Sequence, residues 1–276
     1  MTIPISDTIK MAATYTTEIS RTAPVILGGA LQDGLVNLSS LGYHAIELHF
    51  ASPNQINLAA VSAACKSNRL GISAFATGRA YVNEGLSLIE DDESLRSAAV
   101  NRLMDFVDAA APFNATVIIG CIRGNLKNSE NKDMYLDRLA QSTRRVAVYA
   151  AEKGVPIVFE AINRYENNYL NTAAETLAFI KGYDLPNTKI LLDTFHMNIE
   201  DPDMAEAILA CGPLVGYVHL ADSNRLYPGA GHIDFKPILS ALKAIHYNGY
   251  ISAECLPLPD SDTAIQNWIK GVKSAF

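Results

Sequence analysis

The chain has 276 residues, of which 49% are hydrophobic and 18% are charged, so it can bury a large core. This composition excludes a disordered tail and a membrane protein. The formal net charge of -7 at pH 7 disfavours the phosphate backbone of nucleic acids as a partner. We therefore expect one globular domain over residues 1–276 that does not bind nucleic acid.

The cysteines and the N-terminal segment bear on location. Cys65, Cys121, Cys211 and Cys255 are far apart and form no CxxC pair, which is typical of reduced thiols in a reducing compartment. Residues 1–17 lack a basic stretch followed by a continuous apolar run, and no other run approaches membrane-spanning length. We expect a cytoplasmic location and no membrane association.

Short apolar runs alternate with longer segments of helical periodicity along the whole chain, which is typical of repeated βα units. The expected strands, in chain order, are Lys10–Tyr15, Ala45–His49, Gly71–Ala76, Thr116–Gly120, Pro156–Glu160, Lys189–Asp193, Val215–Leu220 and Tyr250–Cys255. The clearest amphipathic helices between them are Leu95–Ala111, Tyr135–Glu152, Thr172–Lys181 and Phe235–His246. Eight units of about 34 residues each predict an α/β fold of the (β/α)8 TIM-barrel type.

Local signals refine this prediction. Asp201 followed by Pro202 predicts the N-cap and first residue of a helix. An open, doubly wound sheet is the alternative architecture. It normally carries a GxGxxG turn after its first strand, and the pair Gly28-Gly29 does not form one. The barrel is therefore favoured.

Four consecutive expected strands end in residues that can bind a metal, namely Glu160, Asp193, His219 and Glu254. Each follows the previous one by roughly one βα repeat, about 30 residues, so the four side chains should converge at the carboxyl ends of neighbouring strands. Three carboxylates held together repel one another unless protons or a cation neutralise them. The pattern predicts a divalent metal site.

Oxygen-rich ligation with one imidazole and no thiolate favours Mn²⁺ or Mg²⁺ over a structural Zn²⁺, and Co²⁺ is also compatible. For any one of the four residues, the alternative is a strand-end side chain satisfied by a backbone amide or a neighbouring arginine. The convergence of all four favours the metal.

Several segments carry a family resemblance. They are FEAINRYE (159–166), LDTFHMNIE (192–200), HLADSNR (219–225), PGAG (228–231) and AE (253–254). Their order and spacing resemble the ketose 3-epimerases, the D-tagatose and D-psicose 3-epimerase group of the xylose-isomerase-like TIM barrels. The segments TGRAY (77–81), VIIGCIRG (117–124) and ECLPLP (254–259) are most similar to the 5-keto-L-gluconate epimerases.

The resemblance implies that Glu160 and Glu254 are both metal ligands and the catalytic acid/base pair, with Asp193 and His219 completing the ligand set. Inverting the carbon next to a ketone requires removing its proton, stabilising the enediolate, and returning a proton to the opposite face. Two opposed carboxylates and a Lewis-acidic metal suit this reaction. The substrate is then a keto-sugar or a keto-sugar acid.

The resemblance also places Glu166, His196 and Arg225 at substrate-contact positions, and it implies association into homo-oligomers. From the residues alone, each has an alternative: Glu166 as a solvated loop carboxylate, His196 as a locally bonded histidine, and Arg225 as an exposed loop cation.

Arg123, which follows the fourth expected strand, is a candidate for pairing with a substrate carboxylate or phosphate. Arg79 is a second candidate after the third strand, and both arginines have surface pairing with Glu84 or its neighbours as the alternative. The hypothesis is that an acidic keto-sugar is preferred over a neutral one.

Other reactions remain open because related barrels carry different chemistry. An aldose-ketose isomerase would use the same metal and carboxylates, and a sugar-binding barrel would need no opposed carboxylates. A DNA-repair nuclease with three zinc ions is disfavoured. His49 and His232 are available as extra ligands, but the third strand ends in Ala76-Thr77 with none.

Overall fold

The computed structural model describes residues 9–276; the first eight residues of the N-terminal segment considered above lie outside the described residues. Eight parallel strands close into a barrel in chain order, and the last pairs with the first. They are Lys10–Thr16 (β1), Ala45–His49 (β3), Gly71–Ala76 (β4), Thr116–Ile119 (β5), Ile157–Glu160 (β6), Thr188–Asp193 (β7), Val215–His219 (β8) and Tyr250–Ala253 (β9). The predicted (β/α)8 fold is confirmed, with each expected strand matched to within two residues at either end.

An additional two-residue strand, Leu27–Gly28 (β2), was not predicted. It pairs in parallel with the end of β1, where Tyr15 lies opposite Leu27. The strand is too short to show any periodicity in the sequence.

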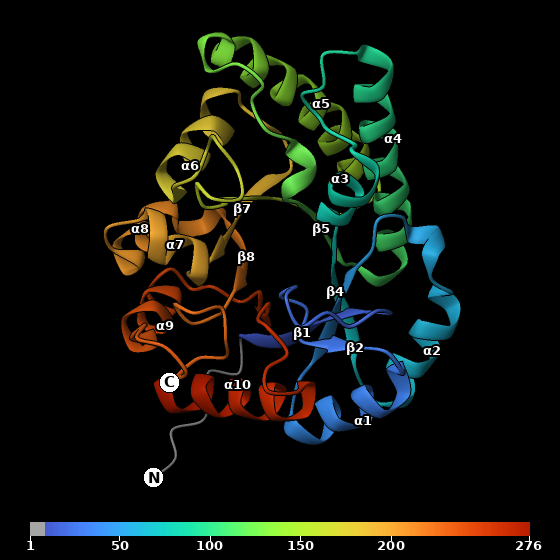
Figure 1. The fold of residues 1–276 in the computed structure, drawn as a ribbon, viewed down its shortest axis with the longest axis vertical. Helices are drawn as coiled ribbons and strands as arrows, with labels where there is room; N and C mark the ends of the chain where they lie inside the picture. Colours follow the sequence, from blue (N-terminus) through green and yellow to red (C-terminus); the bar gives the residue numbers. More distant parts are fainter. Residues whose placement is uncertain (1–8) are drawn as a thin grey trace.

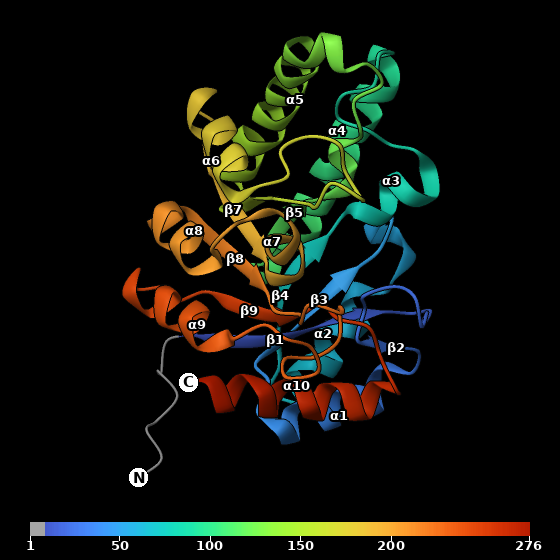
Figure 2. The same ribbon diagram turned by 60° about the vertical axis from the view of Figure 1, so that its left-hand side comes forward.

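Helices surround the barrel (Figure 1). They are Leu31–Leu41 (α1), Leu58–Ser67 (α2), Gly78–Glu84 (α3), Glu93–Ala110 (α4), Lys132–Glu152 (α5), Ala173–Gly182 (α6), Thr194–Glu200 (α7), Met204–Cys211 (α8), Phe235–Ala244 (α9) and Ser261–Ala275 (α10). Figure 2 shows α10 lying beside α1, so the final helix joins the last repeat to the first. Among the described helices, none is both long and apolar enough to cross a membrane.

The helix start predicted at Asp201 and Pro202 is wrong. The next helix, α8, begins two residues later, because Asp203 caps it by accepting a hydrogen bond from the backbone N–H of Glu206. Asp201 instead ends α7, and its carboxylate accepts a hydrogen bond from the backbone N–H of Ala173 at the start of α6. Asp201 is therefore engaged by α6, and the cap of α8 falls to Asp203.

The interior of the barrel explains where the polar residues lie. Its apolar filling is a cluster of six buried side chains, Ala74, Ala76, Ile118, Val158, Leu191 and Tyr217. Because alternate residues of a strand point to the same side, the residue two positions later also faces the interior. That residue is Glu160 on β6, Asp193 on β7 and His219 on β8, whereas just beyond the end of β5 it is Gly120. Charged side chains therefore converge on one part of the barrel mouth, and space is left on another.

Candidate metal centre and active site

The carboxyl ends of the strands surround a cavity of about 440 Å³. Its lining includes Glu160, His219 and Glu254 from the predicted ligand set and Glu166, His196 and Arg225 from the predicted substrate contacts. Gly120 also lines the cavity, and a Cβ atom there would lie only 2.6 Å from Oε2 of Glu160. Because Gly120 has no side chain, the Glu160 carboxylate can occupy this part of the cavity.

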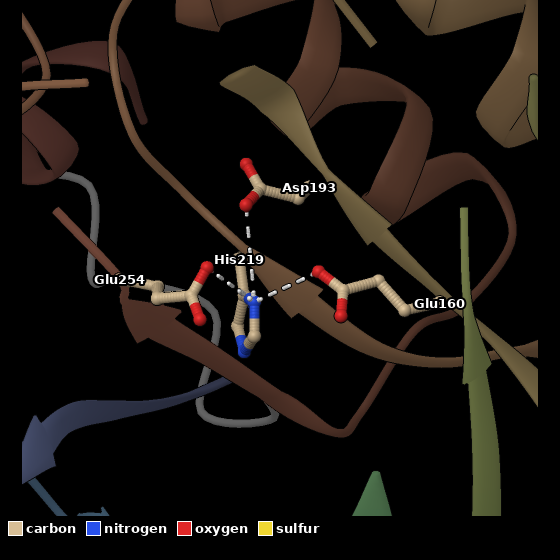
Figure 3. A group of neighbouring side chains, drawn as sticks. All are labelled: Glu160, Asp193, His219 and Glu254. Carbon is tan, nitrogen blue, oxygen red and sulfur yellow. Dashed lines mark ion pairs between the residues drawn. The ribbon is translucent and has the colours of Figure 1, made fainter. Parts of the chain in front are cut away.

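The structure brings the four predicted ligands together, with one donor atom of each within 4.8 Å of all the others. Nδ1 of His219 lies 3.3 Å from Oε2 of Glu254, 3.9 Å from Oε1 of Glu160 and 4.0 Å from Oδ2 of Asp193. In Figure 3 the three carboxylates point toward this nitrogen, with Glu160 and Glu254 on opposite sides of the ring. All four side chains are buried.

Two atoms that could bind a metal are buried in this group without a hydrogen-bond partner among the described residues. They are Oδ2 of Asp193 and Nδ1 of His219. The other oxygen of Asp193 accepts a 2.8 Å hydrogen bond from the backbone N–H of Phe195, where it caps α7. Buried polar atoms are rarely left unpaired, and these two face the other carboxylates. The group therefore fits a divalent cation, which would satisfy both atoms and neutralise the carboxylates.

Glu47, which sequence reasoning missed, holds the far side of His219. Its fully buried carboxylate lies 3.1 Å from Nε2 of His219 and 2.8 Å from Nε2 of His49. A carboxylate accepting the Nε2 hydrogen of a histidine leaves Nδ1 with its lone pair for a metal. The available signal was the alternation within β3, which places Glu47 and His49 on one side of an otherwise apolar strand.

Arg225 connects the second catalytic candidate to the ligand set. Its Nη2 donates a 2.7 Å hydrogen bond to Oε2 of Glu254 and lies 3.4 Å from Oδ2 of Asp193, while the guanidinium packs over the Phe195 ring. Burial alone would raise the pKa of Glu254, but His219 and Arg225 hold that pKa well below its usual range. Glu254 is thus kept ionised.

The remaining two carboxylates are shifted in the opposite direction. Burial and the neighbouring Glu254 raise the pKa of Glu160 well above its usual range. Burial also raises the pKa of Asp193, to about 7, although Arg225 opposes the shift. Without a cation, therefore, Glu160 and Asp193 hold protons, and a metal would displace the proton on Asp193.

His196 and Glu166 lie at the edge of the same group. Nε2 of His196 is 3.6 Å from Oε1 of Glu160, and its Nδ1 is 2.6 Å from Nδ2 of Asn163. Asn163 also donates a 3.0 Å hydrogen bond to the exposed Glu166 carboxylate. His196 is buried between these neighbours, so the structure brings both predicted contact residues to the cavity.

Arg123 does not reach the cavity, and the expectation that it pairs with a substrate carboxylate or phosphate is wrong. Its guanidinium is fully buried against the Phe159 and Tyr169 rings. It donates hydrogen bonds to the backbone carbonyls of Glu160 (2.9 Å), Tyr169 (3.0 Å) and Leu170 (3.3 Å). Three carbonyls turned toward one point attract a cation, so Arg123 ties the loop after β6 to the barrel.

Arg79 lines the cavity, whereas Glu84 pairs with Arg102 at 2.9 Å. Glu84 therefore pairs with neither Arg79 nor Arg123, the two arginines for which this pairing was the alternative. Of the four cysteines, Cys65, Cys211 and Cys255 are buried, Cys121 is half-buried at the cavity, and none forms a disulfide.

Fold and site together define a (β/α)8 barrel with a candidate metal centre at the carboxyl ends of β6 to β9. Residues 35–272 match the family model described as "Xylose isomerase-like TIM barrel", and the chain belongs to that family. The predicted resemblance to the ketose 3-epimerases of the xylose-isomerase-like TIM barrels is confirmed, and the narrower one to the 5-keto-L-gluconate epimerases stays a prediction.

Curated relatives of the chain are carbohydrate epimerases. It is 34% identical over 233 residues to the L-ribulose 3-epimerase of Methylomonas sp. (strain DH-1), an alignment covering 82% of this chain and 78% of the relative. It is 31% identical over 224 residues to the D-psicose 3-epimerase of Agrobacterium fabrum, covering 79% and 76%. A shorter match, 36% over 116 residues, is to the 3-dehydro-D-guloside 4-epimerase of Escherichia coli, covering 42% of this chain and 44% of the relative.

Solved structures give the same picture. The D-allulose 3-epimerase from Methylomonas sp. in complex with D-allulose superposes with a TM-score of 0.83 at 25% sequence identity. The alignment covers 98% of each chain, so the similarity extends over the whole barrel.

Proposed function

We propose that the protein is a metal-dependent epimerase that inverts the carbon next to the ketone of a keto-sugar. The observation that carries this proposal is the pair of opposed carboxylates, Glu160 and Glu254, on either side of the unsatisfied donor atoms of Asp193 and His219. The curated epimerases among the relatives support it.

Glu160, Asp193, His219 and Glu254 would hold the cation, and their oxygen-rich donor set favours Mn²⁺ or Mg²⁺, with Co²⁺ also compatible. When bound, the cation supplies Lewis-acid stabilisation of the negative charge that develops on substrate oxygens. The cation would balance the negative charge on the substrate oxygens. The surrounding side chains would then position the sugar and move its proton.

Glu254, held ionised by Arg225, takes the proton from the carbon next to the ketone, and Glu160 returns a proton to the opposite face. In the reverse reaction the two carboxylates exchange roles. His196 and Arg225 donate hydrogen bonds to the oxygens of the enediolate, and Glu166 orients a sugar hydroxyl at the cavity edge. Because a carboxyl proton exchanges with water, the substrate hydrogen at the inverted carbon is lost to solvent.

The test is epimerisation in D₂O with added Mn²⁺, followed by NMR, over a panel of free ketoses, keto-uronates and ketose phosphates. The expected result is inversion accompanied by deuterium at the carbon next to the ketone. Retention of the substrate hydrogen would indicate a hydride shift and overturn the two-carboxylate mechanism. Formation of an aldose would identify the isomerase reaction, and sugar binding without exchange would identify a binding protein.

The charge of the substrate is a separate question within this proposal. Arg123 is committed to backbone carbonyls, so Arg79 is the remaining candidate to pair with an acidic group. The contribution of Arg79 is measured by comparing kcat/KM for the keto-uronates of the panel between the wild type and Arg79→Met.

Two further expectations stay predictions. Association into homo-oligomers is measured by light scattering after size-exclusion chromatography, and a cytoplasmic location by fractionation of the native cells.

A further inference from the structure

The wall of the cavity formed by β3, β4 and β5 differs from the wall that carries the metal donors. Its strand ends contribute the small or apolar residues Ala76, Ile118 and Gly120 to the lining. Thr77 also lines the cavity, but its hydroxyl is already donated to the backbone carbonyl of Ile118 at 2.7 Å. His49, at the end of β3, is the exception, because it places an imidazole ring in this wall.

The orientation of His49 is fixed by a buried contact. Nε2 of His49 lies 2.8 Å from Oε1 of Glu47, and Nε2 of His219 lies 3.1 Å from the same oxygen. Glu47 is fully buried, His49 is 7% exposed and His219 is also buried, so neither histidine ring can turn freely. A carboxylate only accepts hydrogen bonds, and it therefore favours the tautomer with hydrogen on Nε2 in both rings.

In the neutral ring, the other nitrogen of His49 is then a hydrogen-bond acceptor. Nδ1 of His219 faces the carboxylates of the metal site, whereas Nδ1 of His49 has no hydrogen-bond partner among residues 9–276 while its ring lines the cavity. An acceptor on this wall fits a hydroxyl group. A carboxylate or phosphate offers no hydrogen to it, and the buried negative charges of Glu47 and Glu254 disfavour an anion nearby.

We propose that His49 is a specificity-determining residue whose Nδ1 accepts a hydrogen bond from a hydroxyl of the substrate, on a carbon outside the reacting keto group. The inference rests on the proposed function and narrows its substrate class to keto-sugars with a free hydroxyl at that position. Glu47 is a positioning residue that fixes both imidazoles at once, one for the metal and one for the sugar.

The experiment uses the Mn²⁺-loaded protein, the ketose on which it is most active, and the monodeoxy analogues of that ketose. The wild type is expected to lose about tenfold in kcat/KM when one particular hydroxyl is missing, the loss typical of one hydrogen bond. His49→Phe should lower kcat/KM for the parent ketose by a similar factor. It should leave kcat/KM for that one analogue unchanged, so that the tenfold discrimination disappears.

Two controls separate recognition from folding. His49→Asn, whose amide oxygen can occupy the position of Nδ1, should retain part of the discrimination. His246→Asn changes an exposed histidine before β9, at a positive φ of 55° that asparagine tolerates, and should match the wild type. Calorimetric Mn²⁺ affinity should be unchanged in both His49 variants but weaker in Glu47→Gln, because a neutral amide accepts the two Nε2 hydrogens less strongly than a carboxylate does.

A uniform loss over all analogues in His49→Phe, or full retention of the discrimination, overturns the inference while the proposed function stands. A wild type that exchanges hydrogen with no ketose refutes the proposed function, and the inference falls with it.

Discussion

Nη2 of Arg225 donates a 2.7 Å hydrogen bond to Oε2 of Glu254, and both side chains are buried at the cavity. The same nitrogen lies 3.4 Å from Oδ2 of Asp193. One guanidinium thus contacts two of the four residues proposed to bind the metal, and together with His219 it keeps the pKa of the proposed base, Glu254, below its usual range.

Replacing Arg225 with methionine is therefore expected to lower kcat/KM by about 10²-fold, the usual effect of losing one preorganised donor. Steady-state kinetics on the Mn²⁺-loaded protein measure this. Arg164→Met is the matched control, because Arg164 also pairs with a carboxylate at 2.7 Å, Glu200, but is 61% exposed. Equal activity losses in both variants would contradict a specific role for Arg225.

Glu254→Gln should abolish most of the turnover, by about 10² to 10⁴-fold, because the amide cannot accept the substrate proton. Glu160→Gln should do the same from the opposite face. Deuterium exchange into the ketose, measured by NMR, follows proton removal directly. A Glu254→Gln protein that binds Mn²⁺ and still exchanges at the wild-type rate would rule out Glu254 as the base.

Metal binding is expected to depend on pH. The pKa of Asp193 in the folded chain, about 7, lies above the value of about 4 for an unfolded aspartate, so the metal-free fold is stabilised by this proton at low pH. That contribution is lost as the pH rises from about 4 to about 7. Mn²⁺ replaces the proton, and at about 100 times its Kd it stabilises the fold by about 2.7 kcal/mol.

The increase in Tm caused by a fixed Mn²⁺ concentration should therefore be larger at pH 8 than at pH 5.5, and EDTA should reverse it. Thermal denaturation at the two pH values measures both effects. Asp193→Asn should remove most of the difference between them. A wild-type Tm that responds to neither Mn²⁺ nor EDTA would exclude the proposed metal site.

Arg123→Met should destabilise the fold without changing substrate preference. The substitution removes the Arg123 donor from the carbonyls of Glu160 and Tyr169, and each unsatisfied buried group costs about 1–3 kcal/mol. The carbonyl of Leu170 keeps its hydrogen bond from the Thr176 hydroxyl at 3.2 Å. We expect a lower Tm and an unchanged ratio of kcat/KM between keto-uronates and neutral ketoses. A selective loss for the keto-uronates would restore the direct role that the structure excludes.

The sequence was sufficient to predict the barrel and its four strand-end donors, because strand periodicity and repeat length are local properties. Glu160, Asp193, His219 and Glu254 each stand at the end of an apolar run, and parallel strands bring such ends together. Glu47 was missed because it lies within its strand, where a charged residue looks like an interruption until its partners across the barrel are known.

Arg123 illustrates a different limit. Its position after β5 favoured a substrate contact, but its partners are carbonyls of a loop some 40 residues away along the chain. Only the three-dimensional path of that loop shows that the guanidinium is already occupied. The helix cap was predicted at Asp201 rather than Asp203 for a similar reason. The contact between Asp201 and Ala173 joins two separate helices and is not visible in the local sequence.

The order of the walls around the cavity also has a consequence for how such a barrel can diversify. All four proposed metal donors lie between residues 160 and 254, whereas His49, Arg79 and Gly120 precede them. The first stretch thus supplies one wall of the cavity and Glu47, whereas the second supplies the four donors together with the proposed substrate contacts Glu166, His196 and Arg225. Substitutions confined to His49 and Arg79 would therefore alter this wall of the cavity while leaving the four proposed metal donors in place.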